Sequence, residues 1–315
     1  MKVIGELDTA DSLPFERLIP ALRAMFARGC TVPLRHTHVV GTPDSGQGTV
    51  LLMPAWQDGG YMGVKTVSIY PDNRHRGLPG LHSVYVLFDA RTGVPLALLD
   101  GDVITSRRTA AASALAAKYL SRPDARRMLV VGAGRVASLL PDAYRAVRPI
   151  EAVQVWDIDT ALATRFVERL QADGLLASLA TDLEGAVASA DIISCATLST
   201  EPLVRGAWLR PGTHLDLIGG FTPAMRETDD ACFGVSTVFV DTDEAAMKAG
   251  DLLSPLASGV LRKEAIAANL AALCRDQHPG RTREDEITVF KSVGTALEDL
   301  AAAALAFEAR GAQPG

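Results

Sequence analysis

The sequence lacks the marks of several protein classes. Its four cysteines form no Cys-x-x-Cys pair and no spacing typical of a zinc site. No apolar run approaches the ~20 residues that a membrane helix needs, and the first residues hold no apolar core of signal-peptide length. The net charge of −6 gives no electrostatic reason to expect a nucleic acid or an anionic membrane as partner. We therefore expect a cytoplasmic protein with reduced thiols, no metal ion, and neither nucleic acid nor membrane as partner.

The motifs of three enzyme classes are also missing. The chain has no Gly-x-Ser-x-Gly, no His-Glu-x-x-His and no lysine-bearing P-loop, so hydrolase, zinc-protease and ATPase interpretations have no support. His36 and His38 are two residues apart on a predicted strand and would share one face of it. A metal pair is the weaker interpretation of these histidines, because no other ligand cluster accompanies them, and a polar wall or surface role is the stronger one.

The length and composition predict two folded domains. The chain has 315 residues, whereas a typical domain has about 100–200. Hydrophobic residues make up 48% and charged residues 22%, which is the balance of a soluble globular protein. A chain of this size can bury a large core without disulfides. The order of the predicted elements then separates an N-terminal region from a longer region that follows it.

The N-terminal region combines a helix with a sheet. A helix is predicted over residues 14–28, with Ser12 as its N-cap and Gly29 as its C-terminal stop. Short stretches rich in β-branched and aromatic residues follow, separated by Gly, Pro and Asp, and they predict antiparallel hairpins. The predicted strands lie at 50–53, 61–67 and 83–88, and an alanine-rich helix follows over 105–120.

In the second region, predicted strands and helices alternate, which favours an α/β fold with a parallel doubly wound sheet. A last long helix is predicted over 284–310. We expect it to return to the first region, because the doubly wound pattern is complete before it. The predicted strands are 128–131, 153–156, 191–195, 213–218 and 237–240, with helices over 135–147 and 160–172.

A glycine-rich turn lies between the first predicted strand and helix of the second region. The pattern is Gly132-x-Gly134-x-x-Ala137. The first glycine permits a tight turn, the second lets the backbone approach a pyrophosphate, and the small alanine lets helix and strand pack closely. The phosphates would lie at the N-terminus of the helix, where free N–H groups and the helix dipole favour anions. In this context the turn predicts a dinucleotide-binding Rossmann unit.

An acidic residue supports this prediction. A dinucleotide-binding unit usually has an Asp or Glu about 20 positions further on, at the end of the second strand, where it bonds a ribose hydroxyl. Asp157 follows the strand-like stretch 153–156, 23 positions after Gly134. A carboxylate there repels a 2′-phosphate, so we expect NAD(H), with NADP(H) as the alternative. A plain strand–turn–helix without a nucleotide is the weaker interpretation.

Three cations stand on regular elements of the first region. Lys65 lies inside an apolar strand, Arg108 near the start of the alanine-rich helix, and Arg35 in a strand-like run. Each alone would be interpreted as a solvated surface charge. Together they could surround a carboxylate, because arginine binds one bidentately and lysine adds a movable charge.

These features together resemble the ornithine cyclodeaminase/μ-crystallin family over nearly the whole chain. The resemblance implies a homodimer whose N-terminal sheets pair across the interface. It also implies a substrate-binding and dimerisation domain formed by 1–114 with 286–315, and a Rossmann domain over 115–285. The matching stretches are Gly63–Lys65, Val86–Ala97, Thr105–Ala111, Val131–Gly134, Pro211–His214 and Ile287–Asp299.

Family members move a hydride between nicotinamide and the α-carbon of an amino or imino acid. The resemblance implies that Arg35, Lys65 and Arg108 hold the substrate carboxylate, with Lys65 and Arg108 as the catalytic pair. A segment that includes Lys291 would lie near the nicotinamide. The residues expected to bind the cofactor are Gly132, Gly134, Arg135, Val136, Asp157, Ala196, Thr197, Lys291, Ser292 and Gly294.

One departure from the family pattern bears on the reaction. Cyclodeaminases use an aspartate just after the fifth Rossmann strand as acid and base, and that position here holds Phe221, which cannot transfer a proton. Asp216 lies on the strand and is no obvious substitute. Reduction of a preformed cyclic imine, such as Δ1-pyrroline-2-carboxylate, needs less proton traffic. Lys65 would orient the carboxylate or assist protonation, and Phe221 would lie beside the ring.

We therefore expect an NAD(P)H-dependent ketimine reductase. The alternatives are an ornithine cyclodeaminase, an alanine-type dehydrogenase, and a non-catalytic crystallin-like binding protein. Intact Lys65 and Arg108 and an intact glycine turn argue against the last of these.

Overall fold

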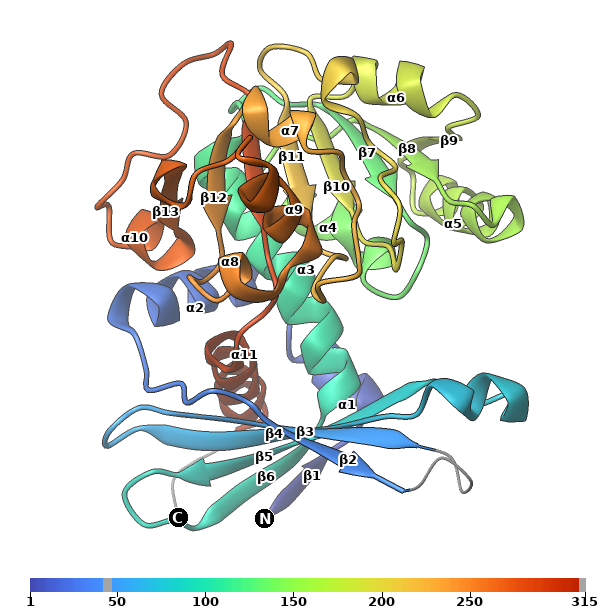
Figure 1. Ribbon diagram of the computed structural model, residues 1–315. Helices are drawn as coiled ribbons and strands as arrows, with labels where there is room; N and C mark the ends of the chain where they lie inside the picture. The colour runs from blue at the N-terminus through green and yellow to red at the C-terminus, as the bar shows by residue number, and fades with distance from the viewer. Residues whose placement is uncertain (42–46, 312–315) are drawn as a thin grey trace. The chain divides into compact units, whose positions relative to one another are not determined.

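The computed structural model describes residues 1–41 and 47–311 (Figure 1). The chain forms two compact units. The first consists of Met1–Arg108 and the chain from Thr295 onward, and the second of Thr109–Gly294. The division between them falls inside one long helix, α3 (Gly101–Leu120). The structure places residues 109–114 and 286–294, which we expected to lie with the N-terminal region, in the second unit.

The first unit is a six-stranded sheet with helices on one face. Strands β2 to β6 form an antiparallel meander, and β1 adds parallel to β6. The antiparallel hairpins predicted from the sequence are therefore confirmed. Helix α11 packs against β3, β4 and β5 and against α2. The bounds are β1 Lys2–Ile4, α1 Glu6–Asp11, α2 Phe15–Arg28, β2 His36–Val40, β3 Gly48–Trp56, β4 Tyr61–Ile69, β5 Leu81–Asp89, β6 Pro95–Asp100 and α11 Ala296–Ala309, with a 3₁₀ helix η1 over Pro71–Arg76.

Alternating burial on β4 and β5 defines the inner face of this sheet. Lys65 and Val67 on β4 and Tyr85 and Leu87 on β5 are buried, while the residues between them are more exposed. Successive side chains of a strand point to opposite faces, so these residues share the face that the helices cover. Lys65 therefore points inward, away from solvent.

The ends of two helices in this unit differ from the predictions. Ser12 is not the N-cap of the second helix. Its hydroxyl donates to the carbonyl of Asp8 and closes α1, whereas α2 follows Pro14. Helix α3 begins at Gly101, four residues earlier than predicted, because Asp100 Oδ1 accepts the backbone N–H of Val103 and so caps it. The stop at Gly29 is confirmed, with a φ of 82° that glycine adopts readily.

The second unit is built on an eight-stranded parallel sheet, in the order β13-β12-β14-β11-β10-β7-β8-β9. Its strands alternate along the chain with helices, which confirms the predicted α/β fold (Figure 1). The strands are β7 Arg127–Val131, β8 Ala152–Trp156, β9 Leu176–Leu179, β10 Ile192–Cys195, β11 His214–Leu217, β12 Thr237–Val240, β13 Ile266–Asn269 and β14 Thr288–Lys291. The helices are α4 Leu140–Arg145, α5 Thr160–Ala172, α6 Leu183–Ser189, α7 Ala231–Gly234, α8 Ala245–Lys248, α9 Gly250–Ser258 and α10 Leu270–Cys274, with 3₁₀ helices η2 Ala137–Leu139, η3 Gly206–Trp208 and η4 Lys263–Ala265.

Two predicted helices of the C-terminal two-thirds were wrong in part. The stretch predicted as helix over 284–310 contains β14, which lies between β11 and β12 in the middle of the sheet, before α11 begins. The helix predicted over 135–147 is a 3₁₀ turn, η2, followed by the short α4. Pro141 has no N–H to donate to the carbonyl of Ala137, so a regular helix cannot run through this point with all its hydrogen bonds.

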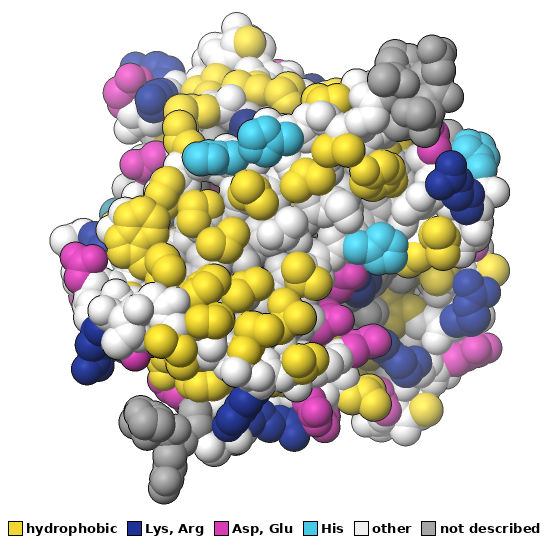
Figure 2. Space-filling model, turned by 90° about the horizontal axis from the view of Figure 1, so that it is seen from below, with side chains coloured by type: hydrophobic (Ala, Val, Ile, Leu, Met, Phe, Trp, Pro, Cys, Tyr) yellow, Lys and Arg dark blue, Asp and Glu magenta, His cyan; other side chains and the backbone are white. Residues whose placement is uncertain are grey.

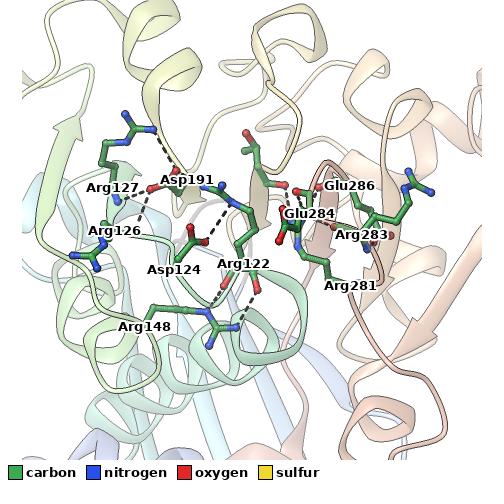
Figure 3. A network of polar contacts seen from close by, with 12 residues as sticks. Arg122, Asp124, Arg126, Arg127, Arg148, Asp191, Arg281, Arg283, Glu284 and Glu286 are labelled. Carbon is green, nitrogen blue, oxygen red and sulfur yellow. Dashed lines mark hydrogen bonds and ion pairs between the residues drawn. The ribbon is translucent and has the colours of Figure 1, made fainter.

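Arginines tie the end of α3 to the edge at which the strands of the sheet begin (Figure 3). Arg148 Nη2 donates to the carbonyls of Ala117, Lys118 and Ser121 at the C-terminal end of this helix. Asp191 accepts hydrogen bonds from two backbone N–H groups, those of Arg126 and Arg127. This edge is opposite to the carboxyl ends of the strands, where α/β proteins bind ligands. In the described parts of the chain, no helix is both long and apolar enough to cross a membrane.

Candidate functional site

The glycine turn follows β7 as predicted. Gly132 has a φ of 110°, and a Cβ there would lie 2.7 Å from the carbonyl oxygen of Ala196. Both facts require glycine. At Gly134, a Cβ would meet no described protein atom within 4 Å, so protein packing does not demand glycine at that position. The backbone is open there, as it must be for a pyrophosphate to approach, and the turn therefore fits a dinucleotide.

Asp157 closes this turn from the end of β8. Its Oδ2 accepts the backbone N–H of Ala133 at 2.7 Å, and its Oδ1 accepts that of Asp159 at 2.8 Å. Each carboxylate oxygen can accept a further hydrogen bond. The side chain is half-buried, so it can fix the turn and still bond a ribose hydroxyl. The donor set of the turn fits NAD(H), because Asp157 adds a negative charge where NADP(H) carries its 2′-phosphate.

The structure brings most of the expected cofactor residues to one edge of the parallel sheet. Ala196 and Thr197 follow β10, Ser292 and Gly294 follow β14, and Phe221, 45% exposed, follows β11. Arg135 is exposed on the glycine turn and Val136 directly precedes η2. The carboxyl ends of parallel strands meet at one edge of a sheet, so these residues lie at the edge where α/β proteins bind ligands, and their contact with the cofactor stays a prediction.

Lys291 differs from its neighbours at this edge. It ends β14 and is fully buried, and its Nζ lies 3.2 Å from Oδ2 of Asp251, which is also fully buried. Its ammonium therefore faces a carboxylate inside the unit.

In the first unit, Lys65 and Arg108 form a buried cluster with two carboxylates of α11. Lys65 Nζ lies 2.8 Å from Asp299 Oδ2, Arg108 Nε lies 3.0 Å from Asp299 Oδ1, and Arg108 Nη1 lies 2.5 Å from Glu298 Oε2. Lys65 also donates to the hydroxyl of Thr105 at 3.2 Å. The structure thus joins two of the three predicted cations in one cluster, which carries two positive and two negative charges.

Burial and charge shift the ionisation of this cluster. Burial lowers the pKa of Lys65 to about 8, although Asp299 opposes the shift. Burial raises the pKa of Asp299, but Lys65 and Arg108 outweigh it and hold the pKa below its usual value. The cluster therefore holds an aspartate that stays ionised next to a lysine able to release a proton near neutral pH.

Arg35 stands directly before β2 and is half-buried. Extending the register of β2 and β3 by one residue places it opposite Met53, which pairs with Lys65. His36 and His38 are exposed on β2.

Sequence reasoning missed Glu298 and Asp299. Both are fully buried in a helix whose other buried residues are all apolar. The signal that could have found them is an acidic pair within an alanine-rich, almost uncharged run. Such residues are rarely buried unless they are paired.

The geometry of the second unit defines a class of protein. A parallel sheet with a glycine turn after its first strand and an acid after its second is a dinucleotide-binding Rossmann unit. A model described as the ornithine cyclodeaminase/mu-crystallin family matches residues 7–312. The chain belongs to this family, and the resemblance identified from the sequence is confirmed.

Similar proteins cover nearly all of the chain. A Delta(1)-pyrroline-2-carboxylate reductase of Paracoccus denitrificans is 42% identical over 299 residues, 93% of this chain and 92% of the relative. The structure of the Thermococcus litoralis Delta(1)-pyrroline-2-carboxylate reductase in complex with NADH and L-proline aligns with a TM-score of 0.91 and 34% identity, over 98% of this chain and 97% of that one. An archaeal alanine dehydrogenase dimer with bound NAD aligns with a TM-score of 0.89 and 28% identity, over 98% and 95%.

Proposed function

We propose that the protein is an NAD(H)-dependent reductase of a cyclic imino acid, with Δ1-pyrroline-2-carboxylate as the substrate that fits best. The observation that carries the proposal is the buried Lys65–Arg108 pair in a chain whose other unit has a dinucleotide turn. The likeness to two reductases of this name, over nearly their full length, supports it. In this proposal the first unit binds the substrate and the second binds the cofactor.

Lys65 and Arg108 bind the substrate carboxylate in this proposal. Both cations are now paired with Asp299 and Glu298, so the cluster has no net charge. A protonated cyclic imino acid is also neutral overall, with one carboxylate and one iminium. Its carboxylate can share the two cations, and its iminium N–H can be stabilised by the field of Asp299.

The reaction converts a C=N bond into CH–NH by adding one hydride and one proton. Bound NADH supplies the hydride. The proton sits on the imine nitrogen before reduction. When the imino acid binds without this proton, Lys65, whose pKa is lowered to about 8, is the group of the cluster that can supply it near neutral pH. Arg108 remains charged throughout and keeps the carboxylate in place.

The surroundings of Asp216 favour the reductase over the cyclodeaminase. Asp216 is fully buried on β11, and its carboxylate accepts hydrogen bonds from the hydroxyls of Ser113, Tyr144 and Ser194. It is held by three donors and has no exposed surface on which to meet a substrate. It therefore cannot replace the acid–base aspartate at the position of Phe221.

We also propose a cytoplasmic homodimer. The outward face of the six-stranded sheet carries apolar side chains of three central strands, and Figure 2 shows hydrophobic side chains gathered over a wide part of the face seen there. Val84 is 45% exposed on this face of β5. Large exposed apolar patches mark interaction sites. A second copy of the same sheet is the partner that the family resemblance implies.

All four cysteines are free thiols, as suits a reducing compartment.

The direct test is to mix the protein with NADH and Δ1-pyrroline-2-carboxylate and follow the loss of NADH absorbance. Absence of oxidation at every pH between about 5 and 9 would reject the proposal.

Ornithine with NAD, assayed for proline and ammonia, tests the cyclodeaminase. Pyruvate with ammonia and NADH tests the alanine dehydrogenase. Light scattering, with a Val84→Glu variant for comparison, tests the dimer.

A further inference from the structure

One buried carboxylate joins the loops that follow two neighbouring strands of the second unit. Glu227 is fully buried. Its Oε1 accepts the backbone N–H of Thr197 at 2.7 Å and the Thr197 hydroxyl at 2.9 Å. Its Oε2 accepts the backbone N–H of Gly219 at 2.7 Å. Thr197 follows β10 and Gly219 follows β11, so a single side chain fixes the spacing of both loops.

The two glycines after β11 have no room for side chains. A Cβ on Gly219 would overlap the carbonyl oxygen of Thr197 and Oε1 of Glu227, and a Cβ on Gly220 would overlap Oδ2 of Asp251. The backbone here therefore packs directly on two carboxylates. A loop built this way cannot shift without breaking hydrogen bonds to Glu227.

Asp251 and Lys291 in turn fix the backbone of Glu227. Asp251, on α9, accepts the backbone N–H groups of Glu227 and Thr228 at 2.8 and 3.1 Å, and Lys291 pairs with the other oxygen of Asp251. We call Glu227, Asp251 and Lys291 the brace. All three are fully buried. Lys291 therefore acts inside the brace, which explains why its ammonium faces Asp251.

The brace lies at the half of the sheet that the adenosine does not use. The glycine turn and Asp157 belong to β7 and β8, whereas Thr197 and Gly219 follow β10 and β11, on the other side of β7. A dinucleotide crosses the carboxyl edge of such a sheet, with one nucleotide half on each side of the point where the strand order reverses. The loops held by Glu227 are thus those that meet the nicotinamide half.

We propose that Glu227 is a positioning residue for the nicotinamide half of the cofactor. It holds Thr197 and the loop from Gly219 to Phe221 in the arrangement that binding requires, with Asp251 and Lys291 fixing it from behind. The inference rests on the proposed function only for the identity of the cofactor and is independent of the imino acid.

The test compares two ligands on one variant. Glu227→Gln keeps an acceptor for Thr197 but places an NH₂ group against the N–H of Gly219. We expect the Kd of NADH, measured by fluorescence titration, to rise about tenfold, the effect of losing one buried hydrogen bond. The Kd of ADP-ribose, which lacks only the nicotinamide, should stay within about twofold.

Glu286→Gln is the matched control. Glu286 is a second buried carboxylate of this unit, and it accepts the backbone N–H of Thr282 and the hydroxyl of Thr237 near the opposite edge of the sheet. Its variant should lose stability but leave the ratio of the two Kd values unchanged. A Glu227→Gln protein that binds both ligands as wild type does, or weakens both equally, overturns the proposal.

A second variant tests the positioning role of Glu227 if Glu227→Gln does not fold. Glu227→Asp keeps the charge but is too short to reach Thr197 and Gly219 together, so it should weaken NADH selectively as well. An unchanged ratio of the two Kd values overturns the proposal in this variant too. The proposed function fails in a different way, by absence of NADH binding or imine reduction in the wild-type protein.

Discussion

The two units bury their charges in different ways. In the first unit, the cations Lys65 and Arg108 are neutralised by the side chains of Asp299 and Glu298. In the second, buried carboxylates are satisfied largely by backbone N–H groups. Asp241, for example, accepts those of Val293 and Gly294, both at 2.7 Å. Side-chain ion pairs neutralise the charges of the first unit, whereas backbone N–H groups meet most buried carboxylates of the second, which also holds the buried ion pair Lys291–Asp251.

This difference separates recognition from positioning. A side-chain ion pair can exchange one partner for a substrate carboxylate of the same charge without moving the backbone. A carboxylate bonded to backbone N–H groups cannot be displaced without reshaping a loop, so it fixes geometry. The first unit thus has charges suited to bind an anion, and the second has charges suited to hold the loops at its carboxyl edge.

The change with the largest expected effect is Lys65→Ala. Loss of a buried charge partner costs a bound carboxylate several kcal/mol, so kcat/KM for the imino acid should fall about 100-fold or more. The Kd of NADH should not change, because the cofactor residues lie in the other unit. Steady-state kinetics and NADH titration measure the two effects. Unaffected turnover would show that Lys65 does not bind the substrate.

Two companion variants sharpen this test. Lys65→Ala leaves Asp299 with one cation fewer, which destabilises the fold, and adding Asp299→Asn should restore stability without restoring turnover. Arg107→Ala removes the neighbouring cation, which donates to the carbonyl of Leu13 and lies over the Phe15 ring. It should keep its turnover.

The same lysine predicts a pH dependence. Burial lowers the pKa of Lys65 to about 8, so the side chain is a cation below that pH and a neutral amine above it. The neutral form attracts no carboxylate and has no proton to give. With NADH saturating, kcat/KM should therefore fall about tenfold per pH unit above about 8. This fall at high pH should disappear in Lys65→Arg. A flat pH profile in the wild type would contradict the role given to Lys65.

The glycine turn and Asp157 could be predicted because their signals are local. Conformational need, short spacing and the preceding strand all lie within a few residues of Gly132. The parallel strands β7, β8, β10, β11 and β12 were found for the same reason, each as a compact apolar run.

Features that depend on distant partners could not be predicted. Strand β14 has only four residues and ends in a lysine, so it forms no compact apolar run, and only its pairing with β11 and β12 makes it a strand. Asp299 meets Lys65 across 234 positions of sequence. Glu227 has no motif of its own, and its role emerges only when two loops converge on it.

Asp157→Ala tests the second unit at the ribose. Loss of a charge-assisted hydrogen bond should weaken NADH about tenfold, while NADPH, freed from repulsion, should weaken less or bind better. Asp159→Ala is the matched control, since Asp159 caps α5 through the N–H of Leu162 and should lower stability by about 1 kcal/mol without changing cofactor preference. Equal losses for both cofactors in Asp157→Ala would refute the ribose role.

The smallest expected effect is a difference in stability between variants of two buried tyrosines, one from each unit. In the second unit, the hydroxyl of Tyr144 donates to Asp216 at 2.9 Å. In the first, that of Tyr85 finds no hydrogen-bond partner among residues 1–41 and 47–311, and its ring lies against Gly63. Tyr144→Phe should lower the free energy of unfolding by about 1.5 kcal/mol, because it removes a hydrogen bond to a buried carboxylate. Tyr85→Phe removes only an unsatisfied hydroxyl, so it should leave stability unchanged or slightly raised. Denaturant unfolding of both variants measures the difference. A loss in Tyr85→Phe as large as that in Tyr144→Phe would mean that the Tyr85 hydroxyl has a bonded partner in solution.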